Sequence, residues 1–283
     1  MLKIAIQSKG RLNESSLDLL KASGISVSSA ARSLTAKATG FPLEVLYLRD
    51  DDIPQAVAIG VADIGIVGQN EMAESEQVVT EVMPLGFGSC RISLAVPKNS
   101  GYYGLAWFNG KRVATSYPKI LEKFFQRNHI RAKIHKIAGS VEVAPAVGLA
   151  DAIFDIVSSG GTLVQNGLVE VEKVFPSEAV LIATPGLSGE KEALLKKLLL
   201  RFKSIKESRG YKYVLMNLPT ESLEKAIAMM PGMKSPTLIP LARDGWHALQ
   251  VVIHESELWD KIENVKEIGA EDILVLDLEN IIR

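Results

Sequence analysis

A strand, a loop and the start of a helix follow one another in the segment Ala152-Ile153-Phe154-Asp155-Ile156-Val157-Ser158-Ser159-Gly160-Gly161-Thr162-Leu163. The first six residues form an apolar run that is typical of a buried strand. The small residues after it predict a loop, and helix-like sequence resumes at about Thr162. A buried strand that leads through a short loop into a helix is the unit from which α/β folds are built.

The loop has the composition of a phosphate-binding segment. It consists of Ser158, Ser159, Gly160, Gly161 and Thr162. Small side chains let backbone N–H groups approach a ligand closely, and a helix start adds partial positive charge. Asp155 at the strand end suits a ribose hydroxyl or a bound Mg²⁺. A plain turn with Thr162 as the helix N-cap is the alternative.

Two familiar nucleotide motifs do not match this loop. A lysine followed by serine or threonine is missing after Gly161, so the loop is not an ATPase P-loop. The two adjacent glycines also lack the three-glycine spacing of a dinucleotide site. An acidic residue before a Ser/Gly/Thr loop suits a sugar 5-phosphate, and the segment therefore suggests a phosphoribosyl donor.

Bulk properties narrow the class of protein. The 283 residues are enough for roughly two domains. A formal net charge of -1 argues against nucleic acid or a membrane surface as partner. Cys90 is the only cysteine, which excludes a disulfide framework and fits a reducing compartment. Met1–Gln7 resembles a strand rather than a signal peptide, and no apolar run approaches the ~20 residues that span a bilayer, so we expect a cytoplasmic protein.

Strand-like and helix-like segments alternate through the first two-thirds of the chain and predict a mostly parallel α/β sheet. Ile59–Ile64 resembles Val147–Ala152, and both have a glycine before a short buried strand. Glycine at helix ends is common on its own, but two related α/β lobes would also explain the repeat. Ligands bind at the carboxyl ends of strands in open α/β sheets, so two facing lobes would form a cleft.

The last part of the chain has a different order of elements. From about Tyr211 to Leu278 the pattern predicts a ferredoxin-like βαββαβ unit. We expect residues 1–208 to form a region of two lobes, with the second lobe at about 92–180, and residues 209–283 to form the separate unit. By analogy with similar small domains, this unit would sense a small effector.

Several polar residues follow predicted strands. Lys9 and Arg11 follow the first strand, and Arg49 follows Leu43–Leu48. These cations suit a phosphate or a purine edge, although solvated loop charges are the alternative. Tyr117 closes another strand, where it marks either a substrate contact or a plain turn.

Glu142 is expected to begin a helix over Val141–Leu149, beside the phosphate loop. There it would either complement the helix dipole or contact ribose hydroxyls. The four histidines show no metal-ligand spacing, which gives no support to a metal site built from His or Cys. No Ser/His elbow supports nucleophilic hydrolysis either.

Five motifs resemble the ATP phosphoribosyltransferase family, which catalyses the first step of histidine biosynthesis. They are Lys9-Gly10-Arg11-Leu12, Arg49-x₂-Asp52-Ile53-Pro54, Asp63-x-Gly65-Ile66-x-Gly68, Glu142-x₅-Gly148-x-Ala150-Asp151-x₃-Asp155-x₂-Ser158-x-Gly160-Gly161-Thr162-Leu163 and Pro231-Gly232-x₂-Ser235-Pro236-Thr237. Together they extend over essentially the whole chain, which therefore resembles the long form of the family. Each motif alone is weak, but the set is specific.

The resemblance implies two periplasmic-binding-protein-like lobes with an active site between them, and an ACT-like regulatory domain. The implied partners are ATP, phosphoribosyl pyrophosphate and histidine as inhibitor, in dimers and hexamers. Mg²⁺ would be carried by the pyrophosphate group rather than by a protein metal site. The implied contacts are Asp155, Ser158, Ser159, Gly160, Gly161 and Thr162 for the phosphoribosyl group, Lys9, Arg11 and Arg49 for the phosphates and nucleotide, Glu142 and Tyr117 as site lining, and Asn217, Thr237 and Ala270 for histidine.

In the reaction of this family, N1 of adenine attacks the anomeric carbon and pyrophosphate leaves. The neutral ring nitrogen needs no general base, so catalysis depends on positioning and on stabilising charge. Asp155, Glu142 and Arg49 are the catalytic candidates. Asn70 stands where many members have aspartate, and Gln7-Ser8 where many have an apolar residue and proline, so we expect no charged role at position 70.

Two other functions stay open from the sequence. One is a non-catalytic small-molecule sensor with binding-protein-like lobes. The other is a phosphoribosyltransferase that acts on another base.

Overall fold

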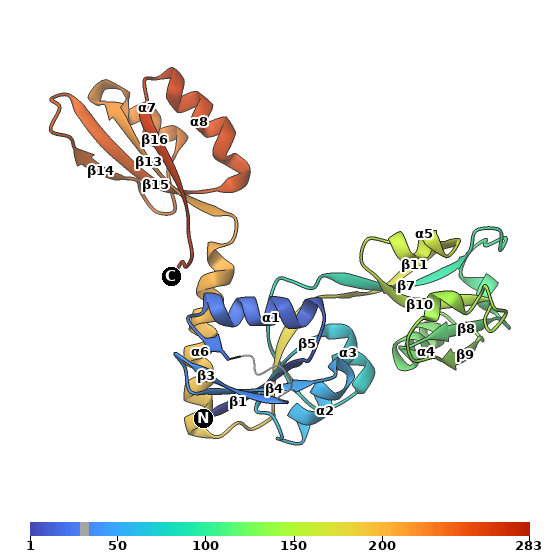
Figure 1. Ribbon diagram of the computed structural model, residues 1–283. Helices are drawn as coiled ribbons and strands as arrows, with labels where there is room; N and C mark the ends of the chain where they lie inside the picture. The colour runs from blue at the N-terminus through green and yellow to red at the C-terminus, as the bar shows by residue number, and fades with distance from the viewer. Residues whose placement is uncertain (29–33) are drawn as a thin grey trace. The chain divides into compact units, whose positions relative to one another are not determined.

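Three β-sheets organise residues 1–28 and 34–283, which are the residues that the computed structural model describes (Figure 1). The first sheet has the strand order β2-β3-β4-β1-β5-β12-β6. Its strands are β1 (Leu2–Gln7), β2 (Ser26–Val27), β3 (Thr35–Thr39), β4 (Leu43–Leu48), β5 (Ile64–Gly68), β6 (Thr80–Pro84) and β12 (Ala179–Ala183). The central strands β4, β1 and β5 are parallel, and the flanking strands are antiparallel.

Helices of this lobe follow its parallel strands. They are α1 (Arg11–Ala22) after β1, the 3₁₀ turn η1 (Asp50–Asp52) and α2 (Ile53–Ala58) after β4, and α3 (Gln69–Ser75) after β5. Ile4, Val45 and Ile64 in the three central strands are fully buried. Parallel strands that are covered on both faces are expected to be apolar throughout, and this accounts for the apolar runs in the sequence.

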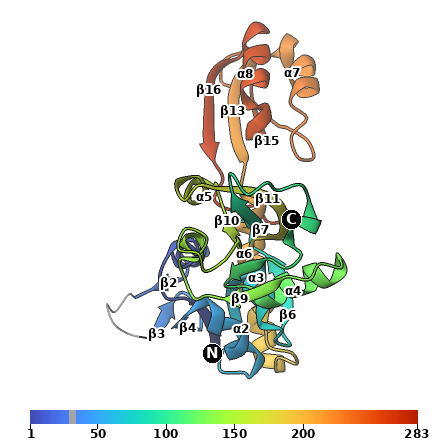
Figure 2. The ribbon, with the colours of Figure 1, turned by 90° about the vertical axis from the view of Figure 1, so that its right-hand side faces the viewer.

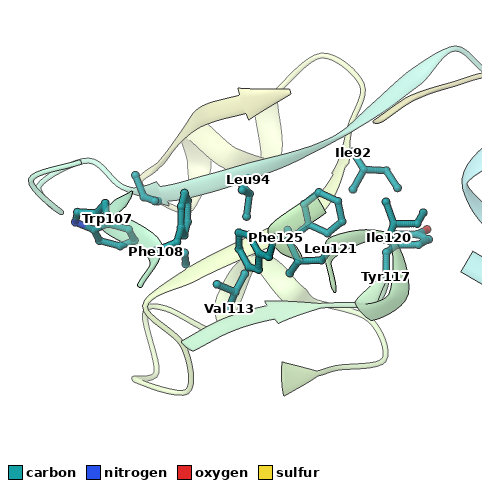
Figure 3. Packing of buried hydrophobic residues seen from close by; sticks show 12 residues of the cluster. Ile92, Leu94, Trp107, Phe108, Val113, Tyr117, Ile120, Leu121 and Phe125 are labelled. Carbon is teal, nitrogen blue, oxygen red and sulfur yellow. The ribbon is translucent and has the colours of Figure 1, made fainter. Parts of the chain in front are cut away.

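The second sheet has the order β11-β7-β10-β8-β9. Its elements are β7 (Cys90–Pro97), η2 (Leu105–Phe108), β8 (Arg112–Thr115), α4 (Pro118–Arg127), β9 (Lys133–Lys136), η3 (Val141–Val143), β10 (Ala152–Val157), α5 (Gly161–Gln165) and β11 (Leu168–Ser177). An aromatic core lies beneath β7, where Figure 3 shows Trp107, Phe108 and Phe125 in one row with Tyr117 at its end. A second core contains Val157 and Leu163, so the sheet is packed on both faces.

The chain passes between the two sheets twice, and the two connections lie side by side. The Leu85 N–H donates to the Ala179 carbonyl (2.9 Å), and the Ala179 N–H donates to the Phe87 carbonyl (2.9 Å). The Gly86 N–H also donates to a carboxylate oxygen of Glu178 (3.0 Å). These bonds join the lobes through paired backbone rather than through a single linker.

The C-terminal part forms the third sheet, with the order β14-β15-β13-β16 and antiparallel pairing throughout. Its elements are β13 (Tyr211–Pro219), η4 (Thr220–Ser222), α7 (Leu223–Met229), β14 (Thr237–Pro240), β15 (Trp246–His254), η5 (Glu255–Glu257), α8 (Leu258–Glu267) and β16 (Glu271–Asp277). Both helices cover the same face of this sheet (Figure 2). The element order is the βαββαβ order expected from the sequence.

Two compact units, Met1–Lys197 and Leu198–Arg283, divide the chain within the long helix α6 (Gly189–Ser208). The boundaries expected from the sequence, residues 1–208, about 92–180 and 209–283, stay predictions. Strand β12 follows the second sheet in the chain but pairs with β5 and β6 of the first sheet.

The predicted helix over Val141–Leu149 is wrong beyond its first turn. Only the 3₁₀ turn η3 forms, and turns follow it. Pro145 has no N–H to donate to the carbonyl of Val141 and its ring crowds that carbonyl, which prevents a continuing α-helix. Glu142 therefore lies in a short turn, not at the start of a long helix.

Phe154→Ala should destabilise the first unit strongly. Phe154 is fully buried in the aromatic core, and truncation of such a side chain typically costs about 3–5 kcal/mol. Thermal melting of the full chain measures the effect. Ile156→Ala, two residues further along β10, removes a side chain that is 42% exposed and should lower the melting temperature far less. Equal losses in both variants would contradict this account of the core.

Candidate active site

The carboxyl ends of β1 and β4 bring the predicted cationic segments together. Gln7 pairs with Leu48 in the parallel register, and the Ser8 N–H donates to the Leu48 carbonyl (2.7 Å). Gln7 Nε2 also donates to Asp50 Oδ2 (3.2 Å). The loop with Lys9 and Arg11 therefore lies beside the turn that follows Arg49, and all three cations are exposed.

Gly10 makes this first loop possible. Its φ of 95° lies in the region that side chains disfavour, and it is the N-cap residue of α1. The glycine of the Lys9-Gly10-Arg11 motif is thus required by the backbone, and the two cations flank the start of a helix.

A cavity of about 740 Å³ lies next to these strand ends. Its lining consists of Arg49, Asp50, Asp51, Glu71, Glu74, Ser75, Ser116, Tyr117, Lys119, Lys136, Ile137, Ala138 and Gly139. Two predicted site residues, Arg49 and Tyr117, are among them. Both charge signs are present, so the cavity can bind a ligand that has anionic and hydrogen-bonding groups.

A buried hydrogen-bond network crosses from α3 to the second sheet. Tyr117 Oη donates to Glu71 Oε1 (2.8 Å), and Asn70 Nδ2 donates to Tyr117 Oη (3.2 Å) and to Glu71 Oε1 (3.0 Å). The Ser177 hydroxyl donates to Asn70 Oδ1 (2.8 Å) and accepts from the Asn70 N–H (3.1 Å). Asn70 thus uses both ends of its amide, which agrees with the expectation that this position has no charged role.

Burial changes the ionisation of this network. The pKa of Glu71 is raised to about 7, chiefly by desolvation and to a smaller extent by the carboxylates of Asp50, Asp51 and Glu74, while the hydrogen bond from Tyr117 acts in the opposite direction. The pKa of Tyr117 is also raised, first by burial and then by the negative charge of Glu71. Tyr117 is therefore a neutral hydrogen-bonding group at physiological pH.

Two further glutamates of the first lobe contact the start of α4. Glu74 accepts hydrogen bonds from the Lys119 and Ile120 N–H groups (3.0 Å each). Glu76 pairs with Lys119 (3.1 Å) and Lys123 (2.6 Å). A carboxylate at a helix N-terminus is stabilised by the helix dipole, so these contacts join the lobes beside the cavity.

The loop that is predicted to bind phosphate lies between β10 and α5. Gly160 has a φ of 84° and is the N-cap of α5. The alternative in which Thr162 is an ordinary N-cap is therefore wrong. Ser158, Ser159 and Thr162 are exposed, so their hydroxyls are accessible to a ligand.

Asp155 lies in β10, three residues before the first residue of this loop. Its pKa is raised to about 6, chiefly by burial and also by the negative charge of Glu142, while the Ile156 N–H, which donates to Oδ1 (2.8 Å), acts in the opposite direction. The structure thus brings Asp155 and Glu142 close enough to interact. Asp155 and the loop belong to one continuous segment, at the end of β10 and before α5.

The three residues predicted for histidine lie in the C-terminal unit. Asn217 is paired with Glu271, which follows Ala270, and Asn217 Nδ2 donates to Asp272 Oδ2 (3.1 Å). Thr237 instead lines a cavity of about 860 Å³, together with Tyr213 and other side chains of this unit. Asn217 and Ala270 therefore lie close together, whereas Thr237 belongs to another part of the sheet.

Sequence reasoning missed Glu71, Glu74 and Lys136 as lining of the cavity. Glu71 and Glu74 follow the carboxyl end of β5. Arg49 was selected because ligands bind at the carboxyl ends of strands, and the same reasoning would have selected these two glutamates. Lys136 is the last residue of β9. Within residues 1–28 and 34–283 no group of three or more His, Cys, Asp or Glu residues could hold a metal ion. No helix in the described part of the chain is both long and apolar enough to span a membrane.

Comparison with protein families gives two matches along the chain. The ATP phosphoribosyltransferase model matches residues 49–204. The model of the HisG C-terminal domain matches residues 208–280. Full-length relatives agree: the ATP phosphoribosyltransferase of Bacteroides thetaiotaomicron is 54% identical over 282 residues, with 100% of both chains covered. That of Cytophaga hutchinsonii is 51% identical over 283 residues, covering 100% of this chain and 99% of the relative.

Solved structures give the same result for the fold. A chain of the ATP phosphoribosyl transferase (HisG:HisZ) complex from Thermotoga maritima matches with a TM-score of 0.63 and 29% identity, over 72% of this chain and 96% of that chain. The substrate binding protein of an amino acid ABC transporter matches with a TM-score of 0.50 and 14% identity, over 73% of this chain and 93% of its own. At this identity the second likeness concerns the fold alone. The predicted fold class, with binding-protein-like lobes and a C-terminal sheet domain, is confirmed.

Glu71→Gln should change how stability depends on pH. Because the folded-state pKa of Glu71, about 7, lies above the ordinary value of 4.5, the wild type loses stability as pH rises from about 4.5 to 7. Glutamine cannot ionise, so the variant should gain up to about 3 kcal/mol relative to wild type across that range.

Thermal melting at pH 5 and pH 8 measures the change. Glu76→Gln is the control of opposite sign, because Lys123 and Lys119 lower the pKa of Glu76 and its ionised form is the stabilising one. Parallel pH curves for wild type and Glu71→Gln would show that Glu71 titrates normally.

Proposed function

Because the chain belongs to the ATP phosphoribosyltransferase family, we propose that it joins N1 of the adenine of ATP to the anomeric carbon of phosphoribosyl pyrophosphate, with release of pyrophosphate. Family models and full-length relatives confirm the family, the transferase class and the histidine-biosynthesis role that the motifs predicted. They favour the enzyme over the non-catalytic sensor. The observation that carries the proposal is the half-buried Asp155 near the end of β10, three residues before the loop Ser158–Thr162, whose hydroxyl side chains are exposed.

The second lobe is proposed to bind the phosphoribosyl group. The loop offers hydroxyls and backbone N–H groups to the 5-phosphate. Asp155 and Glu142 are carboxylates on the sugar side, where positive charge develops as the bond from the anomeric carbon to pyrophosphate breaks. An ionised carboxylate stabilises that charge more strongly in a water-poor site than in bulk water.

The first lobe is proposed to bind phosphates of the substrates. Lys9, Arg11 and Arg49 are cations at neighbouring strand ends, and guanidinium groups match phosphate oxygens in charge and geometry. Tyr117 of the second lobe, which is neutral and lines the same cavity as Arg49, suits the adenine as a hydrogen-bonding group. The arrangement holds the two reactants in place and does not require a general base, since adenine N1 is already nucleophilic.

Mg²⁺ is proposed to enter with phosphoribosyl pyrophosphate. Oxygen atoms of phosphate groups are the hard ligands that this ion prefers, and it usually binds proteins through substrate phosphates and few carboxylates. In the proposed reaction it would stabilise the pyrophosphate leaving group. Since both substrates are made inside the cell, the proposal places the protein in the cytoplasm.

The C-terminal unit is proposed to bind histidine as an inhibitor, at Asn217, Thr237 and Ala270. A βαββαβ unit with one helix-covered face supports this proposal. The strands at the two edges of its sheet favour self-association, in agreement with the expected dimers and hexamers.

A phosphoribosyltransferase for another base is the alternative reaction. It would release pyrophosphate with that base in place of ATP, so an assay in which ATP is exchanged for other bases separates the two reactions.

Arg49→Ala and Asp155→Ala should each lose most of the turnover with the fold intact. Arg49 is exposed and pairs with Asp51 (3.2 Å), so its removal leaves no cavity in a core. Pyrophosphate release from ATP, phosphoribosyl pyrophosphate and Mg²⁺ measures the loss, and thermal melting checks the fold. Lys98→Ala, an exposed change in the loop after β7, serves as the control. Near wild-type kinetics in either variant would remove that residue from the site.

Deletion of residues after about Ser208 should abolish inhibition by histidine. The same pyrophosphate assay is run with and without histidine, on the full chain and on the shortened one. The full chain should be inhibited and the shortened chain should not, because the proposed effector residues are absent from it. Inhibition that survives the deletion would place the effector site in the first unit.

A further inference from the structure

Arg91 reaches the phosphate loop from a neighbouring strand. It lies near the start of β7, directly opposite Val157 in the antiparallel pairing of β7 and β10. Its Nη1 donates a hydrogen bond to the carbonyl oxygen of Ser158 (3.1 Å). Ser158 is the first residue of the loop, so the contact is made where the strand becomes the loop.

The guanidinium is itself fixed on its other side. Nε and Nη2 of Arg91 each donate to one carboxylate oxygen of Glu170 (2.5 Å each), and the Ser93 hydroxyl donates to Glu170 Oε1 (2.7 Å). Ser93 is buried, and the side chains of Arg91 and Glu170 are 29% and 20% exposed. The pairing raises the pKa of Arg91 and lowers that of Glu170. Two parallel bonds between charged groups define the orientation of the guanidinium.

The contact with the Ser158 carbonyl fixes the orientation of the whole peptide group between Ser158 and Ser159. In a trans peptide the C=O and the following N–H point in opposite directions. The peptide that carries the Ser158 carbonyl also carries the Ser159 N–H, so a carbonyl held by Arg91 sets the direction of that N–H. It also keeps a carbonyl oxygen, which repels an anion, bound to a cation.

We propose that Arg91, oriented by Glu170 and Ser93, is a positioning residue that sets the loop Ser158–Thr162 for the phosphoribosyl substrate. This inference rests on the proposed function of the loop. Arg91 acts through the Ser158 carbonyl and not by its own contact with the reacting atoms. The expected consequence is selective: binding of phosphoribosyl pyrophosphate depends on Arg91, whereas binding of ATP does not.

Arg91→Gln in the full chain tests the proposal. KM for phosphoribosyl pyrophosphate should rise about 10-fold or more, since displacement of a binding group by about 1 Å can cost up to about 100-fold. KM for ATP and kcat should change much less. Arg91→Lys, which keeps a charge able to reach the Ser158 carbonyl, should recover part of the loss.

Tyr102→Phe is the matched control. Tyr102 follows β7 and its hydroxyl donates to Glu172 Oε1 (2.6 Å), so it also links the β7 region to β11 but does not contact the loop. Phenylalanine keeps the ring contacts of Tyr102 with Trp107 and Phe108. Both KM values should stay at the wild-type level in this variant.

The outcomes separate the two levels of the argument. Wild-type protein that releases no pyrophosphate would contradict the proposed function itself. Active wild type with an unchanged KM for phosphoribosyl pyrophosphate in Arg91→Gln would overturn only the positioning role. A rise of both KM values together with a lower melting temperature would also overturn it, because Arg91 would then only hold the sheet together.

Discussion

Burial of the central strands is the constraint on which the rest of this structure depends. Ile4, Ile64 and Phe154 are fully buried, and an unpaired polar group at such a position would cost several kcal/mol. Charged residues are therefore few within these strands: β1 contains Lys3, β10 contains Asp155 and β5 contains none. Parallel strands have their carboxyl ends at one edge of a sheet. The polar groups of the candidate site follow buried strands at such ends: the cations follow β1 and β4, the glutamates follow β5, and the loop follows β10. The candidate site is thus a consequence of how the sheets are packed.

Features that depend on neighbouring residues could be predicted from the sequence. The apolar runs predicted β1, β4 and β10, because a fully buried strand requires them. The βαββαβ order of the C-terminal part follows from the same local patterns. The predicted helix over Val141–Leu149 was wrong because helix periodicity was given more weight than Pro145. The missing N–H of Pro145 prevents the helix from continuing.

Features that depend on distant residues could not be predicted in this way. Tyr117 receives its partners Asn70 and Glu71 from α3, 47 and 46 residues earlier. Arg91 and Glu170 are 79 residues apart, and neither stands out in its own segment. Register across the sheet brings such groups together, and periodicity carries no information on it. Strand β12 joins the first sheet for the same reason: its apolar residues indicate burial but not which sheet they complete.

Electrostatics couples the two lobes in the proposed reaction. Burial raises the pKa of Asp155 to about 6 and that of Glu71 to about 7. Near pH 7 Asp155 is therefore mostly ionised, but an anionic substrate beside it favours the protonated form. A protonated Asp155 cannot stabilise a cationic sugar. For Asp155 to stay ionised, the negative charge of the phosphates has to be offset. The cations after β1 and β4 and Mg²⁺ on the pyrophosphate group would provide the positive charge. Under the proposed function, Arg49 would therefore have a second role besides phosphate binding: it would help to preserve the charge on Asp155, a carboxylate that the other lobe supplies.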